Sequence, residues 1–330
     1  TAPMSTTAQR PSKNQLCSIY SREIGEHPAG SAPSWQRCLV LEFPKPWKDE
    51  VTDSAHFPTE VSDALAKVEA EGRPIRLQCV TPDPEYTAAG HTRIMLFYRN
   101  PAPASAFGRL EYAVPNDHAV NLAAAIIEDS HDLRQYDRYR DDTDGIRDIL
   151  VCTHGSRDTC CATFGIPIYQ HLRQEYGPAL DGRLRVWRAS HLGGHRLAPN
   201  IVDLPEGRNW VRPEVSQLDA LVYRRGDVSD VSSLYRGLVR LNTPFEQAAE
   251  GAVLMQEGWE WTGRQVSTSI VESSDKQARV RVEATSEDGG KSTAYDVTVV
   301  VSGTVQTVAC LTGEQKTVEE QYTVTSLVPF

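Results

Sequence analysis

Long apolar segments are absent from this sequence. No run of hydrophobic residues approaches the roughly 20 that a membrane-spanning helix needs, and the first fifteen residues lack the apolar core of a signal peptide. Of the 330 residues, 40% are hydrophobic and 24% are charged, which is typical of a globular protein and argues against a disordered chain. We therefore expect a cytoplasmic protein that is not bound to a membrane, with two or three domains for its length.

Positive charge is also scarce. Lysine and arginine together number 34 against 44 aspartate and glutamate residues, which gives a formal net charge of −10. A chain with this excess of negative charge repels the phosphate backbone, so a nucleic-acid partner is disfavoured.

The seven cysteines do not have the spacing of a secreted disulfide scaffold. Their number is odd, and only Cys152, Cys160 and Cys161 are close together in the sequence. In a reducing compartment, clustered cysteines more often bind metal or take part in catalysis than form disulfides. The remaining four are predicted to pack as small buried hydrophobic side chains: these are Cys17, Cys38, Cys79 and Cys310.

Three regions of the chain differ in their residue pattern. Residues 1–145 alternate predicted strands with predicted helices and form an α/β domain. Residues 146–262 form a second α/β domain with a helical extension, in which helices are predicted over 215–223, 228–241 and 246–256. In residues 263–330 apolar and polar residues alternate, which predicts a small antiparallel sheet of about five strands, two of them over 295–301 and 304–311.

The residues with the most distinctive chemistry follow two predicted strands of the second domain. Strand 149–152 ends in Cys152 and leads into a loop that ends at Cys160 and Cys161, and strand 184–189 leads into a loop with His191 and His195. Sulfur and nitrogen ligands together favour zinc or an iron–sulfur cluster over magnesium or calcium. The two loops therefore form a candidate metal site.

The spacing of these residues disfavours three familiar metal sites. Eight residues separate Cys152 from Cys161, which is more than a zinc finger uses but suits a loop around a wider two-iron centre. The glycines between His191 and His195 oppose the helix of a zinc peptidase by about 1 kcal/mol each, and no glutamate follows His191 to act as a base. A Rieske centre is excluded because no histidine follows Cys160 or Cys161 in the C-x-x-H spacing.

Longer motifs around these residues carry a family resemblance. The stretches C-T-H-G-S-R-D-x-C-C, V-W-R-x-S-H-x-G-G-H-R-x-A-P-N and L-P-x-G-x-x-W resemble the sucrase/ferredoxin-like family over about residues 15–260, most specifically between 148 and 212. The resemblance implies two thioredoxin-like units, the second holding a [2Fe–2S] cluster through Cys152, Cys161, His191 and His195. The implied function is one-electron, proton-coupled electron transfer, and any enzymatic activity would be that of an iron–sulfur oxidoreductase. No carboxylate pair for glycoside hydrolysis stands out.

Two other functions fit the same residues. The four ligands could hold zinc in an interaction module, or Cys160 and Cys161 could act as a redox-active thiol pair, although C-x-x-C is absent.

Several residues near the candidate site have predicted structural roles. Arg157 and Asp158 are predicted to form an ion pair, and His154 to be a turn residue or a neighbour of the site. Trp187 and Trp210 are predicted to be core residues. Four arginines around the second ligand strand form either a solvated face or a docking patch for an acidic redox partner: Arg183, Arg185, Arg188 and Arg196.

Overall fold

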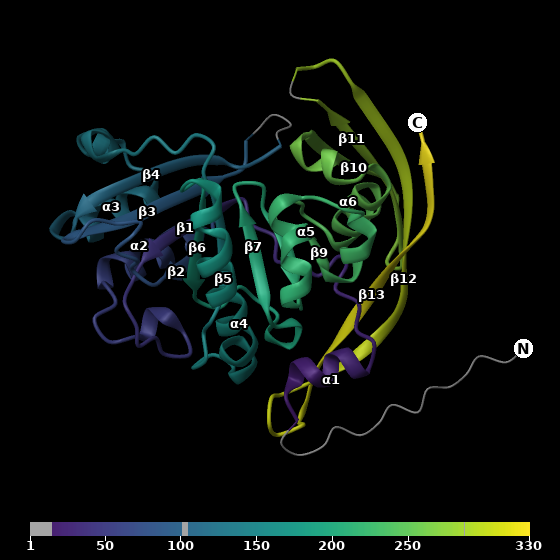
Figure 1. Ribbon diagram of the computed structural model, residues 1–330, viewed down its shortest axis with the longest axis horizontal. Coiled ribbons are helices and arrows are strands. Elements are labelled where there is room, and N and C mark those ends of the chain that lie inside the picture. The colour runs from purple at the N-terminus through teal and green to yellow at the C-terminus, as the bar shows by residue number, and fades with distance from the viewer. Residues whose placement is uncertain (1–14, 101–104, 287) are drawn as a thin grey trace, which may run out of the picture.

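Two β-sheets form the framework of the protein (Figure 1). The computed structural model describes residues 15–100, 105–286 and 288–330, so most of the segment searched for a signal peptide lies outside the described residues. A nine-stranded mixed sheet has the order β4-β3-β1-β2-β6-β5-β7-β8-β9, and a separate antiparallel sheet has the order β10-β11-β12-β13. The prediction of an α/β protein with a C-terminal antiparallel sheet is confirmed at this level. Within the described ranges, no helix combines the length and apolarity needed to cross a bilayer.

The first half of the large sheet contains strands β1 (Arg37–Glu42), β2 (Arg76–Val80), β3 (His91–Tyr98) and β4 (Gly108–Pro115). Strand β2 runs parallel to β1, whereas β3 is antiparallel to both β1 and β4. Helices α2 (Thr59–Ala70) and α3 (Asn116–Glu128) bury their apolar sides against one face of these strands. The sequence predicts all six, as strands over 38–43, 75–80, 93–99 and 109–114 and helices over 61–68 and 118–127, with small differences at their ends.

The second half repeats this connectivity. Strands β5 (Arg147–Cys152) and β6 (Leu184–Ala189) are parallel and are joined by α4 (Thr159–His171), and β7 (Asn200–Leu204) and β8 (Arg208–Val211) follow as antiparallel neighbours. Each half therefore has the strand order 2-1-3-4 when its strands are numbered along the chain. The halves meet at one pairing, between Val80 of β2 and Ala189 of β6.

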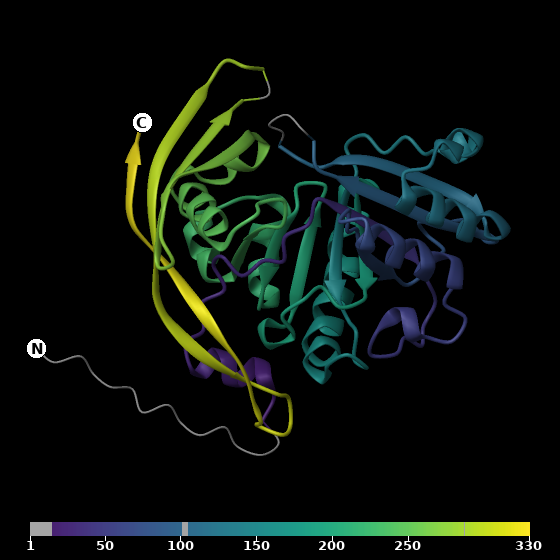
Figure 2. The ribbon, with the colours of Figure 1, turned by 180° about the vertical axis from the view of Figure 1, so that it is seen from behind.

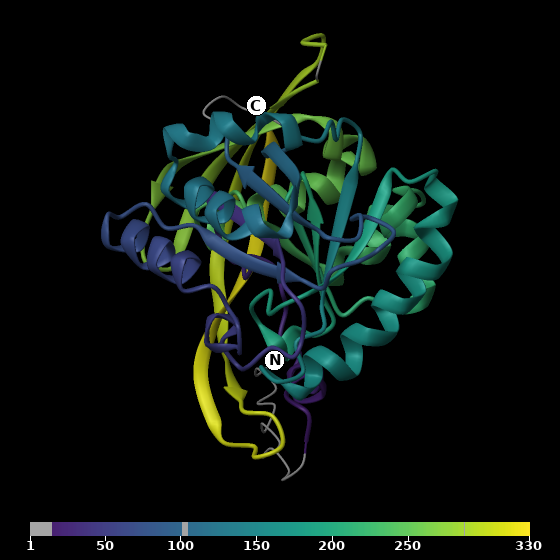
Figure 3. The same ribbon diagram turned by 90° about the vertical axis from the view of Figure 1, so that its left-hand side faces the viewer.

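A common core lies between the two halves. Because successive side chains of a strand point to opposite faces, Leu39 of β1 packs toward α2 and α3, whereas Val40 joins Leu150 of β5 in a second buried cluster. Ile149 and Val151 of β5 point the other way, into the core that α4 and α5 (Leu218–Tyr223) cover. The helices consequently lie on the outer sides of the strands (Figure 3).

The region after residue 199 differs from the sequence prediction. Strands β7 and β8 were not predicted, and the single helix predicted over 228–241 is instead a short 3₁₀ segment, Val228–Leu234, followed by strand β9 (Tyr235–Leu238). The apolar residues of this segment fit a helical pattern, but β9 completes the edge of the sheet beside β8, where pairing overrides local preference.

The C-terminal sheet wraps around α6 (Pro244–Glu257), as the view from behind shows (Figure 2). It contains β10 (Gln265–Ser273), β11 (Gln277–Thr285), β12 (Ser292–Val308) and β13 (Gln315–Pro329). Four strands are described rather than about five, because the two strands predicted within residues 295–311 are parts of the one long strand β12. The predicted alternation is confirmed: Ala278, Val280, Val282 and Ala284 are buried.

Truncation after Gly263 is expected to yield aggregated or poorly folded protein. Val280 and Val297 of this sheet share one core with Val253 and Leu254 of α6 and with Trp261, so the truncation would expose a contiguous apolar face. Recovery of monomeric protein by size-exclusion chromatography and thermal unfolding would measure the effect. A soluble truncated protein that unfolds at the wild-type temperature would show that the sheet contributes no stability.

Candidate metal centre

Strand pairing brings the two predicted ligand loops together. Cys152 is the last residue of β5, and its register partner on the parallel strand β6 is Ala189, so both loops leave the same edge of the sheet. Asp158 begins α4 by accepting a hydrogen bond from the backbone N–H of Cys160 at 2.8 Å. The first turn of α4 then places Cys161 back beside Cys152.

A glycine makes this close approach of helix and strand possible. A Cβ atom at Gly165 of α4 would lie 1.9 Å from the carbonyl oxygen of Cys152. Any side chain at this position would therefore push α4 away from β5 and separate the two cysteines.

Three of the four predicted ligands form one group. The Nδ1 atom of His191 lies 3.9 Å from the sulfur of Cys152 and 3.7 Å from that of Cys161. Both cysteines are buried and His191 is half-buried. The backbone N–H of His191 donates to Nδ1 of His154 at 3.2 Å, and His154 Nε2 bonds the carbonyl of Lys48 at 2.8 Å, so His154 supports the loop.

The fourth predicted ligand, His195, points to a different neighbour. Its Nδ1 lies 3.0 Å from Oδ2 of Asp158 and 3.2 Å from the sulfur of Cys17. The ring centres of His191 and His195 are 6.0 Å apart. The loop between them turns at Gly193 and Gly194, which have φ angles of 88° and 72° that favour glycine. The structure thus brings His195 near the group without placing it among the three.

The adjacent residues Cys160 and Cys161 belong to separate groups. The sulfur of Cys160 lies 3.5 Å from that of Cys17 and 3.1 Å from that of Cys310, whereas Cys161 faces Cys152 and His191. The geometry gives no support to a redox pair made of Cys160 and Cys161. Cys17 and Cys310 pack in an apolar cluster, as predicted, and the structure adds the contacts of their sulfurs with Cys160.

In each of the two cysteine groups, hydrogen bonds from neighbouring side chains lower the pKa of one thiol, Cys152 in the first and Cys160 in the second. Hydrogen bonding from Cys161, followed by that from His191, lowers the pKa of the Cys152 thiol well below its ordinary value, while the same contact raises the pKa of Cys161. Hydrogen bonds from Cys17 and Cys310 lower the pKa of Cys160 to about 3. Thiolates are the form of cysteine that binds metal, and the donor atoms of each group lie close enough together that they could hold a metal ion.

The profile of the sucrase/ferredoxin-like family matches residues 28–241 of the chain, about two thirds of its length. The chain belongs to the sucrase/ferredoxin-like family. Searches of curated proteins and of solved structures gave no match. The matched range includes both strands of the candidate site and the residues Cys152, Cys161, His191 and His195, but neither Cys17 nor Cys310.

The predicted ion pair between Arg157 and Asp158 is absent from the described part of this sucrase/ferredoxin-like chain. Arg157 forms its ion pairs with Asp49 and Glu50 rather than with Asp158. Burial alone would raise the pKa of Asp158, but the hydrogen bonds of His195 and Cys310 lower it to about 2. Asp158 therefore acts as a helix cap and a charged neighbour of His195. Trp187 and Trp210 are core residues, as predicted.

The four arginines do not form one docking patch. Arg185 is only 5% exposed and pairs with buried carboxylates, which corrects its assignment to a partner surface. Arg183 precedes β6 and therefore lies at the end of that strand away from His191. Arg196 is paired with Glu26 and Glu319, and Arg188 is half-buried over the ring of Tyr169.

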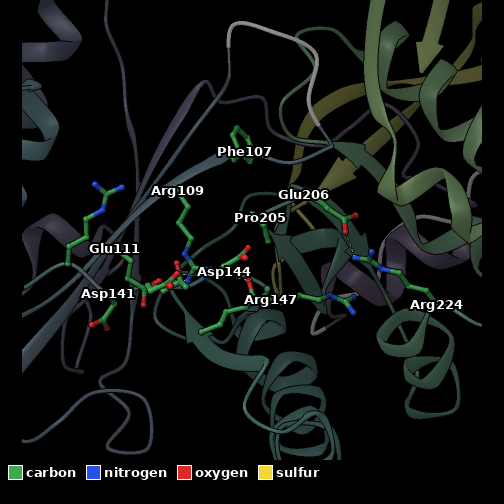
Figure 4. A pocket seen from close by; sticks show the side chains of 14 residues that line it. Phe107, Arg109, Glu111, Asp141, Asp144, Arg147, Pro205, Glu206 and Arg224 are labelled. Carbon is green, nitrogen blue, oxygen red and sulfur yellow. Dashed lines mark hydrogen bonds and ion pairs between the residues drawn. The ribbon is translucent and has the colours of Figure 1, made fainter. Parts of the chain in front are cut away.

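Two cavities lie at different ends of these strands. A recess of about 370 Å³ is lined by His191, His154 and Arg76, with Glu50 and Arg157 also on its wall. Another cavity of about 800 Å³, which includes Arg147 at the start of β5, is lined by charged residues of both signs and by no cysteine or histidine (Figure 4). Only the first recess reaches the candidate metal centre.

Proposed function

We propose that the protein transfers single electrons through one [2Fe–2S] cluster held by Cys152, Cys161, His191 and His195. The observation that carries this proposal is the convergence of two buried cysteines, Cys152 and Cys161, with the half-buried His191 at the edge of the sheet. Two sulfur donors and one imidazole form a soft ligand set of the kind that iron–sulfur clusters use. The group also lies inside the range matched by the family profile.

The surroundings of His195 support its assignment as the fourth ligand. Its Nδ1 is taken up by Asp158, so the other ring nitrogen, Nε2, is the one that remains for a metal. Histidine ligands commonly donate the N–H of their second ring nitrogen in a hydrogen bond to a carboxylate, which fixes the ring and increases its basicity as a ligand. His191, by contrast, presents Nδ1 to the two sulfurs, so the two histidines would use different nitrogens.

The residues around the site would tune and expose the redox centre. When bound, the cluster supplies one-electron chemistry, at a potential that histidine ligands raise above that of an all-cysteine centre. Cys152 and Cys161 provide negative charge in a buried setting, while each histidine can keep a proton on the ring nitrogen that does not bind metal, which is the basis for proposing proton-coupled transfer. The recess beside His191, with charges of both signs on its wall, is where we propose that a redox partner approaches.

We infer that each half of the large sheet is a thioredoxin-like unit, the second of which binds the cluster. The strand order 2-1-3-4, with the first two strands parallel and the last two antiparallel, is that of the thioredoxin fold and occurs in both halves. We also keep the proposal of a cytoplasmic location, where a reducing environment suits the seven free cysteines.

Purification under anaerobic conditions tests this function. We expect a red-brown protein with about two iron and two sulfide ions per chain, and an electron paramagnetic resonance signal that appears after reduction by one electron. Colourless protein that contains zinc in place of iron at these ligands would refute the proposal and favour an interaction module instead.

A further inference from the structure

Three cysteines from distant parts of the chain meet beside the candidate cluster site. Cys17 lies on α1 (Cys17–Glu23), Cys160 on the first turn of α4, and Cys310 in the turn between β12 and β13. Their sulfur atoms are 2.9 Å apart for Cys17 and Cys310, 3.1 Å for Cys160 and Cys310, and 3.5 Å for Cys17 and Cys160. Cys17 and Cys160 are fully buried, and Cys310 is half-buried.

A carboxylate completes this group. Oδ1 of Asp158 lies 3.1 Å from the sulfur of Cys310 and 3.9 Å from that of Cys17, while Oδ2 of the same residue faces His195. The four residues could offer one donor atom each to a metal ion, since those atoms all lie within 4.8 Å of one another. Asp158 thus lies between this group and the proposed iron–sulfur ligands.

We propose that Cys17, Cys160, Cys310 and Asp158 bind one zinc ion that is separate from the iron–sulfur cluster. Three thiolates exclude magnesium and calcium as the preferred ion, and a fourth ligand that is a carboxylate oxygen fits zinc. Four protein donors correspond to a closed tetrahedral site, which is the structural rather than the catalytic type. With zinc–sulfur bonds of about 2.3 Å, tetrahedral sulfur ligands lie about 3.8 Å apart, so binding requires the three sulfurs to separate by less than about 1 Å.

A metal ion fits this arrangement of three sulfurs and one carboxylate better than a disulfide does. Each sulfur has the other two as close neighbours, so a bond between any two would leave the third thiol and the carboxylate buried beside it. A metal ion engages all four residues at once. The three thiols and the carboxylate, which otherwise face one another, become ligands, and the thiols release their protons when the metal binds.

The zinc ion would fasten α1 and the turn between β12 and β13 to the cluster-binding unit. Helix α1 lies beside the turn that joins β12 and β13, which extends beyond the rest of the sheet (Figure 1). Direct hydrogen bonds between these segments run from the N–H of Leu311 to the carbonyl of Gln15, at 3.0 Å, and from the N–H of Cys17 to the sulfur of Cys310. A metal that joins Cys17 and Cys310 to α4 would hold the turn in place and also fix Asp158, the partner of His195.

Metal analysis of the purified full-length chain tests this proposal independently of the cluster. We expect about one zinc per chain in the wild type, loss of that zinc in Cys17→Ser and Cys310→Ser, and unchanged iron and visible absorption in both variants. Cys79→Ala is the matched control, because Cys79 is a fully buried thiol of β2 outside both metal-binding groups. Zinc is counted separately from iron, so a chain that lacks iron would still report on this site.

Limited digestion with trypsin measures whether the zinc ion holds the turn between β12 and β13 in place. Lys316 is exposed and follows the turn that carries Cys310, so cleavage after Lys316 should become faster in Cys310→Ser and in wild-type protein from which a chelator has removed zinc alone. Wild-type protein without zinc, an intact mass that reveals a Cys17–Cys310 disulfide, or full retention of zinc in Cys17→Ser and Cys310→Ser would each overturn the proposal.

Discussion

Alanine in place of Cys161 is expected to abolish iron binding while the protein remains folded. The substitution removes one of the three donors that already converge at the edge of the sheet, and a cluster iron left one ligand short is poorly retained. We expect the visible absorption and the iron content to fall at least tenfold, and Cys152→Ala to have the same effect. Iron and sulfide analysis of protein purified anaerobically would measure this.

Two variants make the result specific. Cys38→Ala removes an equally buried thiol from the same core cluster as Cys152 and Cys161, so it reports the cost of losing a buried sulfur that is no ligand. Cys160→Ala removes the adjacent sulfur, which points to the other group, and should retain iron. If Cys160→Ala loses iron and Cys161→Ala keeps it, the assignment of the two cysteines is reversed.

The candidate site was largely predictable where ligands are close in sequence. The motif that holds Cys152 and Cys161 and the H-x-x-x-H pair each follow a strand, and parallel pairing of those strands brings the loops together. The grouping of Cys17 with Cys310 was not predictable in this way, because 292 residues separate them and neither lies in a short-range motif. Only the packing of α1 and of the β12–β13 turn against α4 reveals it.

The same contrast holds for the fold. Where periodicity is clear the bounds were predictable: the sequence predicts a helix over 61–68 and a strand over 278–284, close to the observed α2 and β11. Strand β8 has only four residues, Arg208–Val211, which is too short for a pattern, and β9 lies in a sequence whose local preference is helical. The burial of Arg185 was also missed, because a charged residue on a strand is usually solvated. Here carboxylates that are distant in the sequence surround it, one on β4 and one on β5.

That buried arginine belongs to an ion-pair network between the two halves of the sheet. Arg185 of β6 bonds Glu111 of β4 at 2.7 Å and Asp148 of β5 at 2.8 Å. Arg109 pairs with both carboxylates, and Trp187 donates to Asp148 at 2.7 Å. Glu111 and Arg109 form part of the wall of the charged cavity in Figure 4. The carboxylates of Glu111 and Asp148 have no exposed surface, so in the folded protein they depend on these side chains for their partners.

Glu111→Ala is therefore expected to lower the free energy of unfolding by about 3–5 kcal/mol, the usual cost of removing one member of a buried ion pair. Urea unfolding followed by circular dichroism would measure the change. Glu128→Ala is the control, because it breaks the exposed pair with Lys67 and should cost much less. Equal effects of the two substitutions would show that the buried network contributes no more than a surface pair.

The stability of the wild type should also fall in acid because of this network. Burial alone would raise the pKa values of Glu111 and Asp148, but the charges and hydrogen bonds of Arg185 and Arg109 lower them below their ordinary values of 4.5 and 3.8. A carboxylate whose pKa is lowered in the folded state stabilises the fold fully above its unfolded pKa, and that stabilisation is lost as the pH falls through the folded value. Glu111→Gln cannot titrate at this position, so its deficit relative to the wild type should be largest at pH 7 and should narrow below about pH 4.5. Urea titrations of both proteins between pH 7 and pH 3 would measure the difference in their free energies of unfolding. A difference that stays constant over this range would mean that the charge on Glu111 does not stabilise the junction of the two halves.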